Sequence, residues 1–272
     1  MSRREFTGRV VLVTGAAGGL GAALCRCLSD AGARIAAMDL DAARLDVLVA
    51  ELRAVGAPAL AIPGDITDST ACQSAVATTL AHFGALDGLI NNAGISARSL
   101  LVDTDPKVIR RVMGVNFFGA ANLTRAALEA ILVRRGFIVA ISSVAGFSPL
   151  TGRTAYAASK HALHGFFDSL RSEVEGAGVD VTLVCPSFIR TGIGSAATDG
   201  GGAPVGGPRI TTGGESTPED IAVRIVDAVA ARRSLLLPDA TSRKAWWLSR
   251  LAPGLYARIM KRRVGEEFAG LP

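Results

Sequence analysis

A tyrosine and a lysine stand four positions apart in the stretch TAYAASKHAL, residues 154–163. Residues at this spacing lie one above the other on a helix, so the Tyr156 hydroxyl and the Lys160 ammonium would share one face. A phenol beside a fixed cation is a candidate general acid or base, because the cation stabilises the phenolate. A half-buried ring beside a solvated charge has the same spacing, so other residues must distinguish the two interpretations.

A glycine-rich turn, TGAAGGLG at 14–21, separates an apolar run from a helical pattern. Glycines at such a turn let a pyrophosphate approach the N–H groups of the helix, where the helix dipole favours an anion. No Gly-Lys-Ser or Gly-Lys-Thr follows, which argues against an ATP-type phosphate loop. A plain strand–helix corner is the alternative interpretation. The residues expected to contact a dinucleotide here are Gly15, Gly19, Leu20 and Gly21.

Asp39 ends the second apolar run, about twenty residues beyond the glycines, where an acidic side chain can bind the ribose 2′-OH of a dinucleotide. Its charge would repel a 2′-phosphate, so the sequence favours NAD over NADP. Arg44, one turn into the next helix, leaves NADP open. Asp41 is expected to cap that helix.

These residues need a scaffold, and apolar runs alternate with helical patterns along the chain in the way that a parallel sheet with crossover helices requires. Strands are expected at 10–14, 34–39, 58–63, 86–91, 137–142, 179–185 and 234–237. Helices are expected at 19–31, 41–55, 68–83, 104–133, 156–176 and 217–231. The sequence thus predicts an α/β protein with a doubly wound, seven-stranded parallel sheet in a single domain.

The composition suits such a core, because 49% of the 272 residues are hydrophobic and the mean hydropathy is +0.36. The basic N-terminus lacks the longer apolar run of a secretion signal, and no apolar segment approaches the roughly 20 residues of a membrane span. We therefore expect a cytoplasmic protein. The four cysteines lack metal-ligand spacing, and Cys25 and Cys27, which fall in a helical pattern, are expected to be small buried thiols instead of a redox pair. His161 and His164 have no ligand partner nearby, so no metal site is predicted and both are expected on a helix surface or at an interface.

Residues 192–215 interrupt the alternation of strands and helices, because they contain nine glycines and two prolines. A loop of this length inside a compact domain is usually a functional lid or a disordered segment. Its position after the sixth expected strand favours a substrate lid.

Six short motifs follow one another along the chain: TGAAGGLG at 14–21, GDIT at 64–67, NNAG at 91–94, VNFFG at 115–119, ISSVAG at 141–146 and YAASK at 156–160. In this order they resemble the short-chain dehydrogenase/reductase family over about residues 7–237. The resemblance implies a Rossmann-type fold. It also implies a catalytic group made of Asn116, Ser143, Tyr156 and Lys160.

In the chemistry that this resemblance implies, Tyr156 exchanges a proton with the substrate oxygen. A free tyrosine has a pKa of about 10, and lowering it by about three units needs roughly 4 kcal/mol of phenolate stabilisation. The Lys160 ammonium and an oxidised nicotinamide ring could supply this together, and Lys160 would also hold the nicotinamide ribose. Ser143 would hold the substrate oxygen, and Asn116 would position a water that relays protons from Lys160. Ser143 as a covalent nucleophile lacks a suitable histidine and carboxylate.

Further cofactor contacts are carried over from the family's pattern. Asp65 would lie against the adenine, and Asn91 would line the cofactor channel. The segment CPSFIRT at 185–191 resembles the family's Pro-Gly-x-x-x-Thr, except that Ser187 replaces the glycine and could shift the backbone beside the nicotinamide. The other residues expected at the cofactor are Ile66, Asn92, Ala93, Gly94, Pro186, Ile189 and Thr191.

The substrate is expected to be a hydrophobic secondary alcohol or ketone, or an alcohol and aldehyde pair. The segments expected to wall the substrate cleft, namely Ile95-Ser96, residues 144–150 and Phe188, are largely apolar, and no arginine clamp is evident. Two other functions stay open. One is a sugar-nucleotide epimerase or dehydratase, which also uses a Tyr-x-x-x-Lys pair. The other is a non-catalytic dinucleotide sensor, which would have little reason to keep Tyr156, Lys160 and Ser143 together.

Residues 240–272 form a basic extension after the expected catalytic domain, residues 1–239. They carry seven basic and two acidic side chains, which accounts for the whole net charge of +5. Apolar residues recur four apart at Trp247, Leu251, Leu255 and Ile259. Pro253-Gly254 should divide this amphipathic segment into two short helices. Such a segment can lie at a membrane surface, although packing over the substrate cleft or against another subunit is the alternative.

Partners other than the substrate are expected to be copies of the same chain. The resemblance implies a homodimer or homotetramer formed through the helices expected at 104–133 and 156–176. No aromatic stacking platform accompanies the basic extension, so a nucleic-acid partner is not expected.

Overall fold

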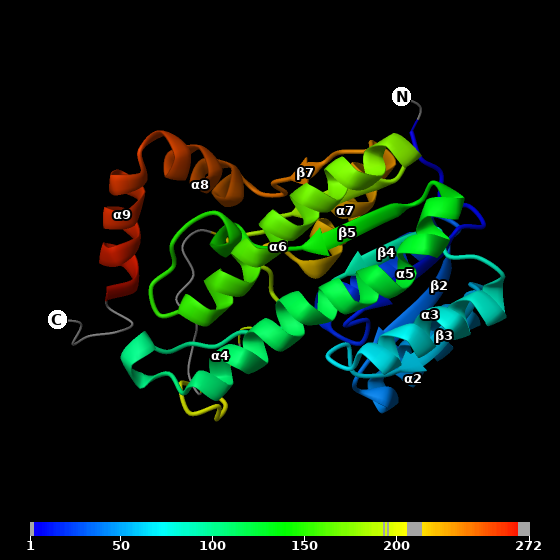
Figure 1. The fold of residues 1–272 in the computed structure, drawn as a ribbon, viewed down its shortest axis with the longest axis horizontal. Coiled ribbons are helices and arrows are strands. Elements are labelled where there is room, and N and C mark those ends of the chain that lie inside the picture. The colour runs from blue at the N-terminus through cyan, green and yellow to red at the C-terminus, as the bar shows by residue number, and fades with distance from the viewer. Residues whose placement is uncertain (1–2, 193, 195, 206–213, 266–272) are drawn as a thin grey trace.

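A seven-stranded parallel sheet forms the centre of the computed structural model, which describes residues 3–192, 194, 196–205 and 214–265 (Figure 1). Its strand order is β3-β2-β1-β4-β5-β6-β7. The strands are β1 (Val10–Thr14), β2 (Arg34–Asp39), β3 (Ala59–Pro63), β4 (Gly88–Asn91), β5 (Phe137–Ile141), β6 (Asp180–Val184) and β7 (Leu235–Leu236). The predicted doubly wound α/β sheet is therefore confirmed.

Helices cover both faces of this sheet. One face packs against α1 (Gly19–Asp30), α2 (Ala42–Ala54) and α7 (Pro218–Ala230). The other packs against α3 (Ser69–Phe83), α5 (Ala120–Arg134) and α6 (Thr154–Val174). Within β1, Val11 and Val13 enter the first core and Val10 and Leu12 the second, because successive side chains of a strand point to opposite faces.

Two further helices follow β7, and the break between them lies where Pro253 predicted it. They are α8 (Ala240–Leu251) and α9 (Pro253–Gly265), which Figure 1 shows at one end of the molecule. Residues 266–272, at the end of the expected extension, lie outside the described residues. Within the described ranges, no helix combines the length and the apolar composition needed to cross a bilayer.

The chain order of the strands reverses at β1. The chain moves from β1 outward to β3, then crosses back to place β4 on the other side of β1. The loops after β1 and β4 therefore leave the sheet in opposite directions, and the crevice between them is where open α/β sheets bind ligands.

The single helix expected over residues 104–133 is interrupted. The structure has α4 (Pro106–Met113), a π-helical turn (Gly114–Gly119) and then α5. At Gly119 an added Cβ would lie 2.6 Å from Cδ1 of Ile66, so only a glycine allows this approach. Wide turns of this kind are frequent at functional sites. The periodicity of apolar residues could not reveal this local widening.

Part of the expected lid is attached to the segment that follows β4. The backbone N–H of Arg98 donates to the carbonyl of Thr198 at 2.8 Å, and that of Asp105 donates to the carbonyl of Gly200 at 2.8 Å. A Cβ at Gly200 would overlap the carbonyl oxygen of Asp103, so the close approach needs glycine. Residues 193, 195 and 206–213 of the expected lid lie outside the described residues.

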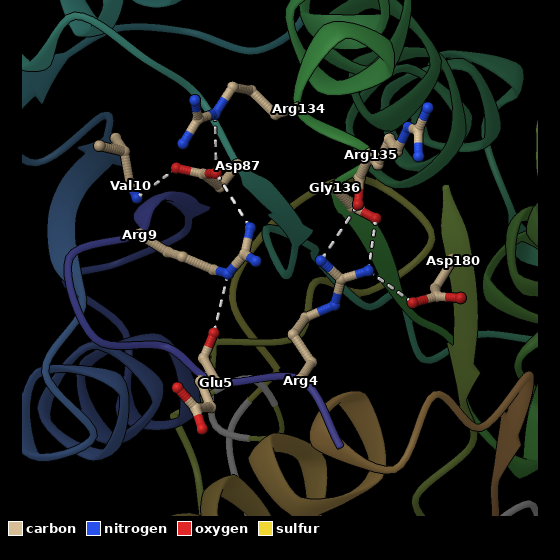
Figure 2. A network of polar contacts seen from close by, with 9 residues as sticks. All are labelled: Arg4, Glu5, Arg9, Val10, Asp87, Arg134, Arg135, Gly136 and Asp180. Carbon is tan, nitrogen blue, oxygen red and sulfur yellow. Dashed lines mark hydrogen bonds and ion pairs between the residues drawn. The ribbon is translucent and has the colours of Figure 1, made fainter. Parts of the chain in front are cut away.

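Charged side chains join the amino ends of four strands, at the edge opposite the crevice (Figure 2). Asp87, before β4, is fully buried and accepts hydrogen bonds from Arg9, Arg134 and the backbone N–H of Val10. Arg4 is also buried and donates to Asp180 of β6 at 2.6 Å and to the carbonyl of Gly136 at 2.9 Å. These contacts join the amino ends of β1, β4, β5 and β6. The cavity described below lies at the opposite, carboxyl ends of the strands.

Candidate active site

A cavity of about 840 Å³ opens at the carboxyl ends of strands β1 to β6. This volume is within the range of small-molecule and cofactor sites, roughly 300–1,000 Å³. The predicted site residues that line it are Gly15, Gly19, Leu20, Gly21, Asp39, Asp65, Ile66, Asn92, Ala93, Gly94, Ser143, Tyr156, Lys160, Pro186, Ile189 and Thr191. Residues that the resemblance assigned to one site are thus brought to one cavity from distant parts of the chain.

The glycine turn places the start of α1 on the wall of this cavity. Gly15 has a positive φ of 62°, and a Cβ at Gly21 would overlap the carbonyl oxygen of Gly15. Gly18 is the N-cap residue of α1, and among the described residues no side chain caps the start of this helix. Uncapped N–H groups at a helix start, beside a cavity and without intervening side chains, fit the pyrophosphate of a dinucleotide.

Asp39 lies at the end of β2 and joins this turn. Its Oδ2 accepts a hydrogen bond from the backbone N–H of Ala17 at 2.9 Å, and its Oδ1 accepts one from that of Asp41 at 3.0 Å. Asp41 itself caps α2 by accepting from the N–H of Arg44 at 3.1 Å, as the sequence predicted. Asp39 is therefore fixed at the cavity wall, with Arg44 also on that wall.

Asn92 and Thr14 tie the glycine turn to β4. The Asn92 side-chain amide donates to the carbonyls of Thr14 at 2.8 Å and Gly15 at 3.1 Å, and the Thr14 hydroxyl accepts from the N–H of Ala93 at 3.0 Å. The expectation for Asn91 was wrong. Asn91 is the last residue of β4, and its buried side chain donates to Thr124 instead of lining the cavity.

Tyr156 and Lys160 occupy the first turns of α6 and share one face, as their spacing predicted. The Lys160 ammonium lies 5.7 Å from the centroid of the Tyr156 ring and donates to the carbonyl of Ile141, at the end of β5, at 2.8 Å. Lys160 is buried, and desolvation lowers its pKa to about 8. A cation with few competing partners is thereby held beside the phenol ring.

Ser143 follows β5 and begins the short turn Val144–Gly146. Its hydroxyl accepts a hydrogen bond from the N–H of Ala145 at 3.2 Å and lies on the cavity wall. The hydroxyl can still donate its own proton, because this contact uses only an acceptor position. Residues of the adjacent loop 144–150, expected to wall the substrate, do not line the cavity within the described chain, whereas Ile95 does.

Asn116 lies in the π-helical turn and is buried beside the cavity, but it is not among the described residues that line it. Its Oδ1 accepts from the N–H of Ile95 at 2.8 Å, and its Nδ2 donates to the carbonyl of Ile95 and to Ser159 Oγ. A Cβ on Gly94 would lie 3.3 Å from Asn116 Oδ1 and 3.6 Å from Lys160 Nζ. Asn116 therefore bonds the neighbours of two cavity residues, namely Ile95 next to Gly94 and Ser159 next to Lys160.

A polar cluster beneath Lys160 was not anticipated. His164 was expected on a helix surface or at an interface, but its Nε2 lies 3.0 Å from Ser142 Oγ and 3.4 Å from Cys185 Sγ. Burial lowers the pKa of His164 to about 4, so its ring is neutral at ordinary pH. His161 is exposed, as expected. Among the described residues, no three His, Cys, Asp or Glu side chains come together in a way that could hold a metal ion.

Sequence analysis predicted neither Arg111 at the cavity wall nor the partner of Ser187. Arg111 of α4 lines the cavity, and no motif marked it. Ser187, which follows β6, donates two hydrogen bonds to Asp239 at the start of α8. The pattern Asp-x-x-Ser at 239–242 could have identified Asp239 as a helix start, but not its partner 52 residues earlier in the chain.

Comparison with known proteins agrees with this geometry. The family model for short chain dehydrogenases matches residues 9–200. A Bos taurus protein, dehydrogenase/reductase SDR family member 7B, is 41% identical over 266 residues, which cover 95% of this chain and 82% of that protein. An Anopheles gambiae dehydrogenase/reductase SDR family protein 7-like is 39% identical over 267 residues, covering 96% of this chain and 84% of that protein.

Solved structures are similar over most of their length. A short chain dehydrogenase/reductase from Burkholderia phymatum in complex with NAD superposes with a TM-score of 0.83 at 28% identity, covering 93% of this chain and 96% of that one. A metagenomic short-chain oxidoreductase in complex with NADP gives a TM-score of 0.70 at 31% identity, covering 86% and 98% respectively. The chain described here is an oxidoreductase that belongs to the short-chain dehydrogenase/reductase family.

Proposed function

We propose that this protein uses a nicotinamide dinucleotide to interconvert a hydrophobic secondary alcohol and its ketone, or an alcohol and its aldehyde. The observation that carries the proposal is the placement of Tyr156 and Lys160 on the wall of the cavity that the uncapped start of α1 also lines. When bound, the dinucleotide supplies the hydride acceptor or donor. The protein's own part is to orient the substrate and to exchange the hydroxyl proton.

In this proposal Tyr156 takes the proton of an alcohol or gives one to a carbonyl. The buried Lys160 ammonium favours the phenolate through the low dielectric between them. The Ser143 hydroxyl donates to the substrate oxygen and holds it near the phenol. Asn116 acts through its bonds to Ile95 and Ser159, which fix the chain around Lys160. We therefore propose that Asn116 is a positioning residue, in place of the water-mediated proton relay that the family resemblance implied.

Part of the cavity wall supports the proposed class of substrate. Ile95, Pro186, Ile189 and Ala196 line it together with Ser143 and Tyr156. Apolar residues with a small number of polar groups favour a ligand that is mostly hydrophobic. A screen of hydrophobic secondary alcohols with NAD and NADP, read by the absorbance of the reduced ring, tests this function. Binding of the dinucleotide without turnover of any alcohol or ketone would favour the sensor, and turnover of a nucleotide sugar would favour the epimerase or dehydratase.

We propose NAD as the preferred cofactor because Asp39 lies on the cavity wall with its carboxylate held by two backbone N–H groups. Such a fixed negative charge accepts hydrogen bonds from a ribose 2′-OH and repels a 2′-phosphate. Arg44 on the same wall would attract that phosphate. The preference therefore depends on which of these two charges dominates.

Asp39→Asn should move the ratio of kcat/KM for NAD over NADP toward NADP by at least about tenfold, since a single charged hydrogen bond is worth this much. Steady-state kinetics with both cofactors measure the ratio. Asp41→Asn is the matched control, because asparagine still caps α2 and the ratio should stay unchanged. An unchanged ratio in Asp39→Asn would remove Asp39 as the determinant of the preference.

Self-association as a homodimer or homotetramer is also proposed. Its support is the exposed Phe118 at the end of the π-helical turn and the family resemblance, which places the interface on the helices now seen as α4, α5 and α6. We propose no nucleic-acid partner.

We propose further that residues 1–239 form the catalytic domain and that residues 240–272 are an extension of it. The protein would be cytoplasmic, and the extension would bind peripherally to an anionic membrane surface. Trp247 is 62% exposed and Leu251 is 78% exposed, four residues apart on α8. Exposed Arg243 and Lys244 lie beside them. Apolar residues flanked by cations fit the boundary between acyl chains and anionic headgroups.

Sedimentation with vesicles tests the membrane contact. The unmodified chain should sediment with vesicles that contain phosphatidylserine and stay in solution with purely zwitterionic ones. Trp247→Ser combined with Leu251→Ser should reduce the bound fraction several-fold, because two apolar anchors are removed. Val55→Ser, which changes a similarly exposed apolar residue that is not among the described residues lining the cavity, is the control. Equal partitioning of all three proteins would reject the contact.

A further inference from the structure

The start of helix α8 is hydrogen-bonded to the wall of the cavity. Ser187, a residue of that wall, donates its backbone N–H to Asp239 Oδ2 at 3.0 Å and its hydroxyl to Asp239 Oδ1 at 2.8 Å. Asp239 is the N-cap residue of α8. A glycine at position 187, as in the pattern that this segment resembles, could make only the backbone bond. The serine therefore has a specific partner in the C-terminal helix.

Asp239 bonds its own helix with the same carboxylate. Its Oδ1 also accepts from the N–H of Ser242 at 2.7 Å, and its own N–H donates to Ser242 Oγ at 3.2 Å, which completes a capping box. Ser242 is fully buried. The negative charge is favourable at the positive end of the helix dipole. Because one carboxylate bonds both the loop and the helix, neither can shift without losing a charge-assisted hydrogen bond.

A second contact joins α8 to the loop that carries Ser143. Trp246 packs edge-on against Phe147 with ring centroids 4.8 Å apart, and the Arg250 guanidinium lies 3.1 Å from the Trp246 centroid. Phe147 directly follows the turn that Ser143 begins. The N–H of Val144 in this turn donates to the carbonyl of Pro186 at 3.0 Å. The two loops and α8 are therefore joined pairwise into one packed unit.

We propose that Asp239 is a positioning residue of the active site, which fixes the cavity wall at residues 186–191 through Ser187. The inference rests on the proposed function, because it assumes that this cavity binds a nicotinamide dinucleotide. With both bonds in place the wall is ordered before the ligand arrives. Without them, binding must also order this segment, which weakens the affinity.

Three variants and one control separate this role from a purely structural one. Asp239→Asn keeps a good N-cap but replaces one acceptor oxygen with an NH₂ group, so one bond to Ser187 is lost. Ser187→Ala removes the hydroxyl bond alone, and the third variant combines both changes. Ser242→Ala is the control, because it breaks the capping box and leaves both bonds between Ser187 and Asp239 intact.

The readout is the dissociation constant of NADH for the whole protein, measured by isothermal titration calorimetry, with melting temperatures recorded alongside. Asp239→Asn should weaken NADH binding about tenfold, the loss expected for one charge-assisted hydrogen bond. Ser242→Ala should change the constant by less than about twofold, although it lowers the melting temperature through loss of the reciprocal bond from the Asp239 N–H to Ser242 Oγ. The combined variant, in which both the backbone and the hydroxyl bond are weakened or lost, should bind NADH more weakly than either single variant.

The outcomes distinguish a failure of the positioning role of Asp239 from a failure of the proposed function. Equal NADH affinity in Asp239→Asn, in the combined variant and in the unmodified chain would overturn the positioning role and leave the proposed function intact. A drop in affinity for Ser242→Ala as large as that for Asp239→Asn would also overturn it, by showing that helix capping alone matters. If the unmodified chain does not bind NADH, the proposed function fails and this inference fails with it. Should Asp239→Asn not fold, Ser187→Ala carries the same test.

Discussion

Tyr156→Phe should lower turnover by about a hundredfold to ten-thousandfold, the usual contribution of a general acid or base, and leave the affinity for NADH nearly unchanged. Phenylalanine keeps the ring that lies 5.7 Å from the Lys160 ammonium but cannot exchange a proton. Comparing kcat with a calorimetric NADH dissociation constant measures the two effects separately.

The chain supplies its own control for this substitution, since Tyr256 is its only other tyrosine. Tyr256 is buried in α9 and is not among the described residues that line the cavity. Tyr256→Phe removes the same hydroxyl and should leave turnover within a few-fold of the unmodified enzyme. Turnover retained in Tyr156→Phe would remove this phenol from the mechanism.

Lys160→Met should abolish turnover and also weaken NADH binding, because the proposed role of Lys160 includes both the phenol and the cofactor ribose. Its effect on stability should be the opposite of that of most buried substitutions. Burial lowers the pKa of Lys160 to about 8, which means that the folded protein disfavours the charged form. Replacing the ammonium with a thioether removes this penalty, although the bond to the Ile141 carbonyl is lost.

The sign of the pH dependence follows from linkage. An unfolded lysine has a pKa of about 10.4, so between about pH 8 and pH 10 the unfolded chain binds more protons at this residue than the folded chain. The free energy of unfolding of the unmodified apoprotein should therefore gain a contribution as the pH rises through this interval, and Lys160→Met should lack it. The penalty is present in full below about pH 8.

Urea unfolding of the two apoproteins at several pH values between 7 and 10 checks this claim, since it needs only the difference between their free energies of unfolding. The advantage of Lys160→Met over the unmodified chain should shrink as the pH rises, by up to a few kcal/mol. The exposed Lys244→Met on α8 is the matched control and should give no such trend. A difference that stays constant over this range would show that Lys160 is not held as the structure indicates.

Local rules were enough to predict much of this site. The spacing of Tyr156 and Lys160 fixes their common face wherever the segment is helical, and the glycines at 14–21 mark a turn that needs close backbone contact. Strand positions were correct to within about two residues, because buried parallel strands are continuous apolar runs between turn residues. These signals depend only on neighbours in the sequence.

What sequence analysis missed depends on contacts between distant segments. The π-helical turn brings Gly119 close to Ile66, and His164 of α6 contacts Ser142, which follows β5, and Cys185, which follows β6. Asn91 and Asn92 are adjacent, and only the end of β4 decides which of them faces the cavity. No periodicity or motif encodes these pairings, so they become visible only in the folded chain.

The claim on which the proposed function depends most is that the Tyr156 phenol ionises readily beside Lys160 when the dinucleotide is bound. Absorbance of the phenolate against pH measures this directly, because the chain has two tyrosines and burial raises the pKa of Tyr256. In the NAD-loaded enzyme we predict one phenol that ionises well below the usual tyrosine pKa of about 10. This step should be present in Tyr256→Phe and absent from Tyr156→Phe. Ionisation of both phenols only at or above about pH 10 would contradict the mechanism proposed for this protein.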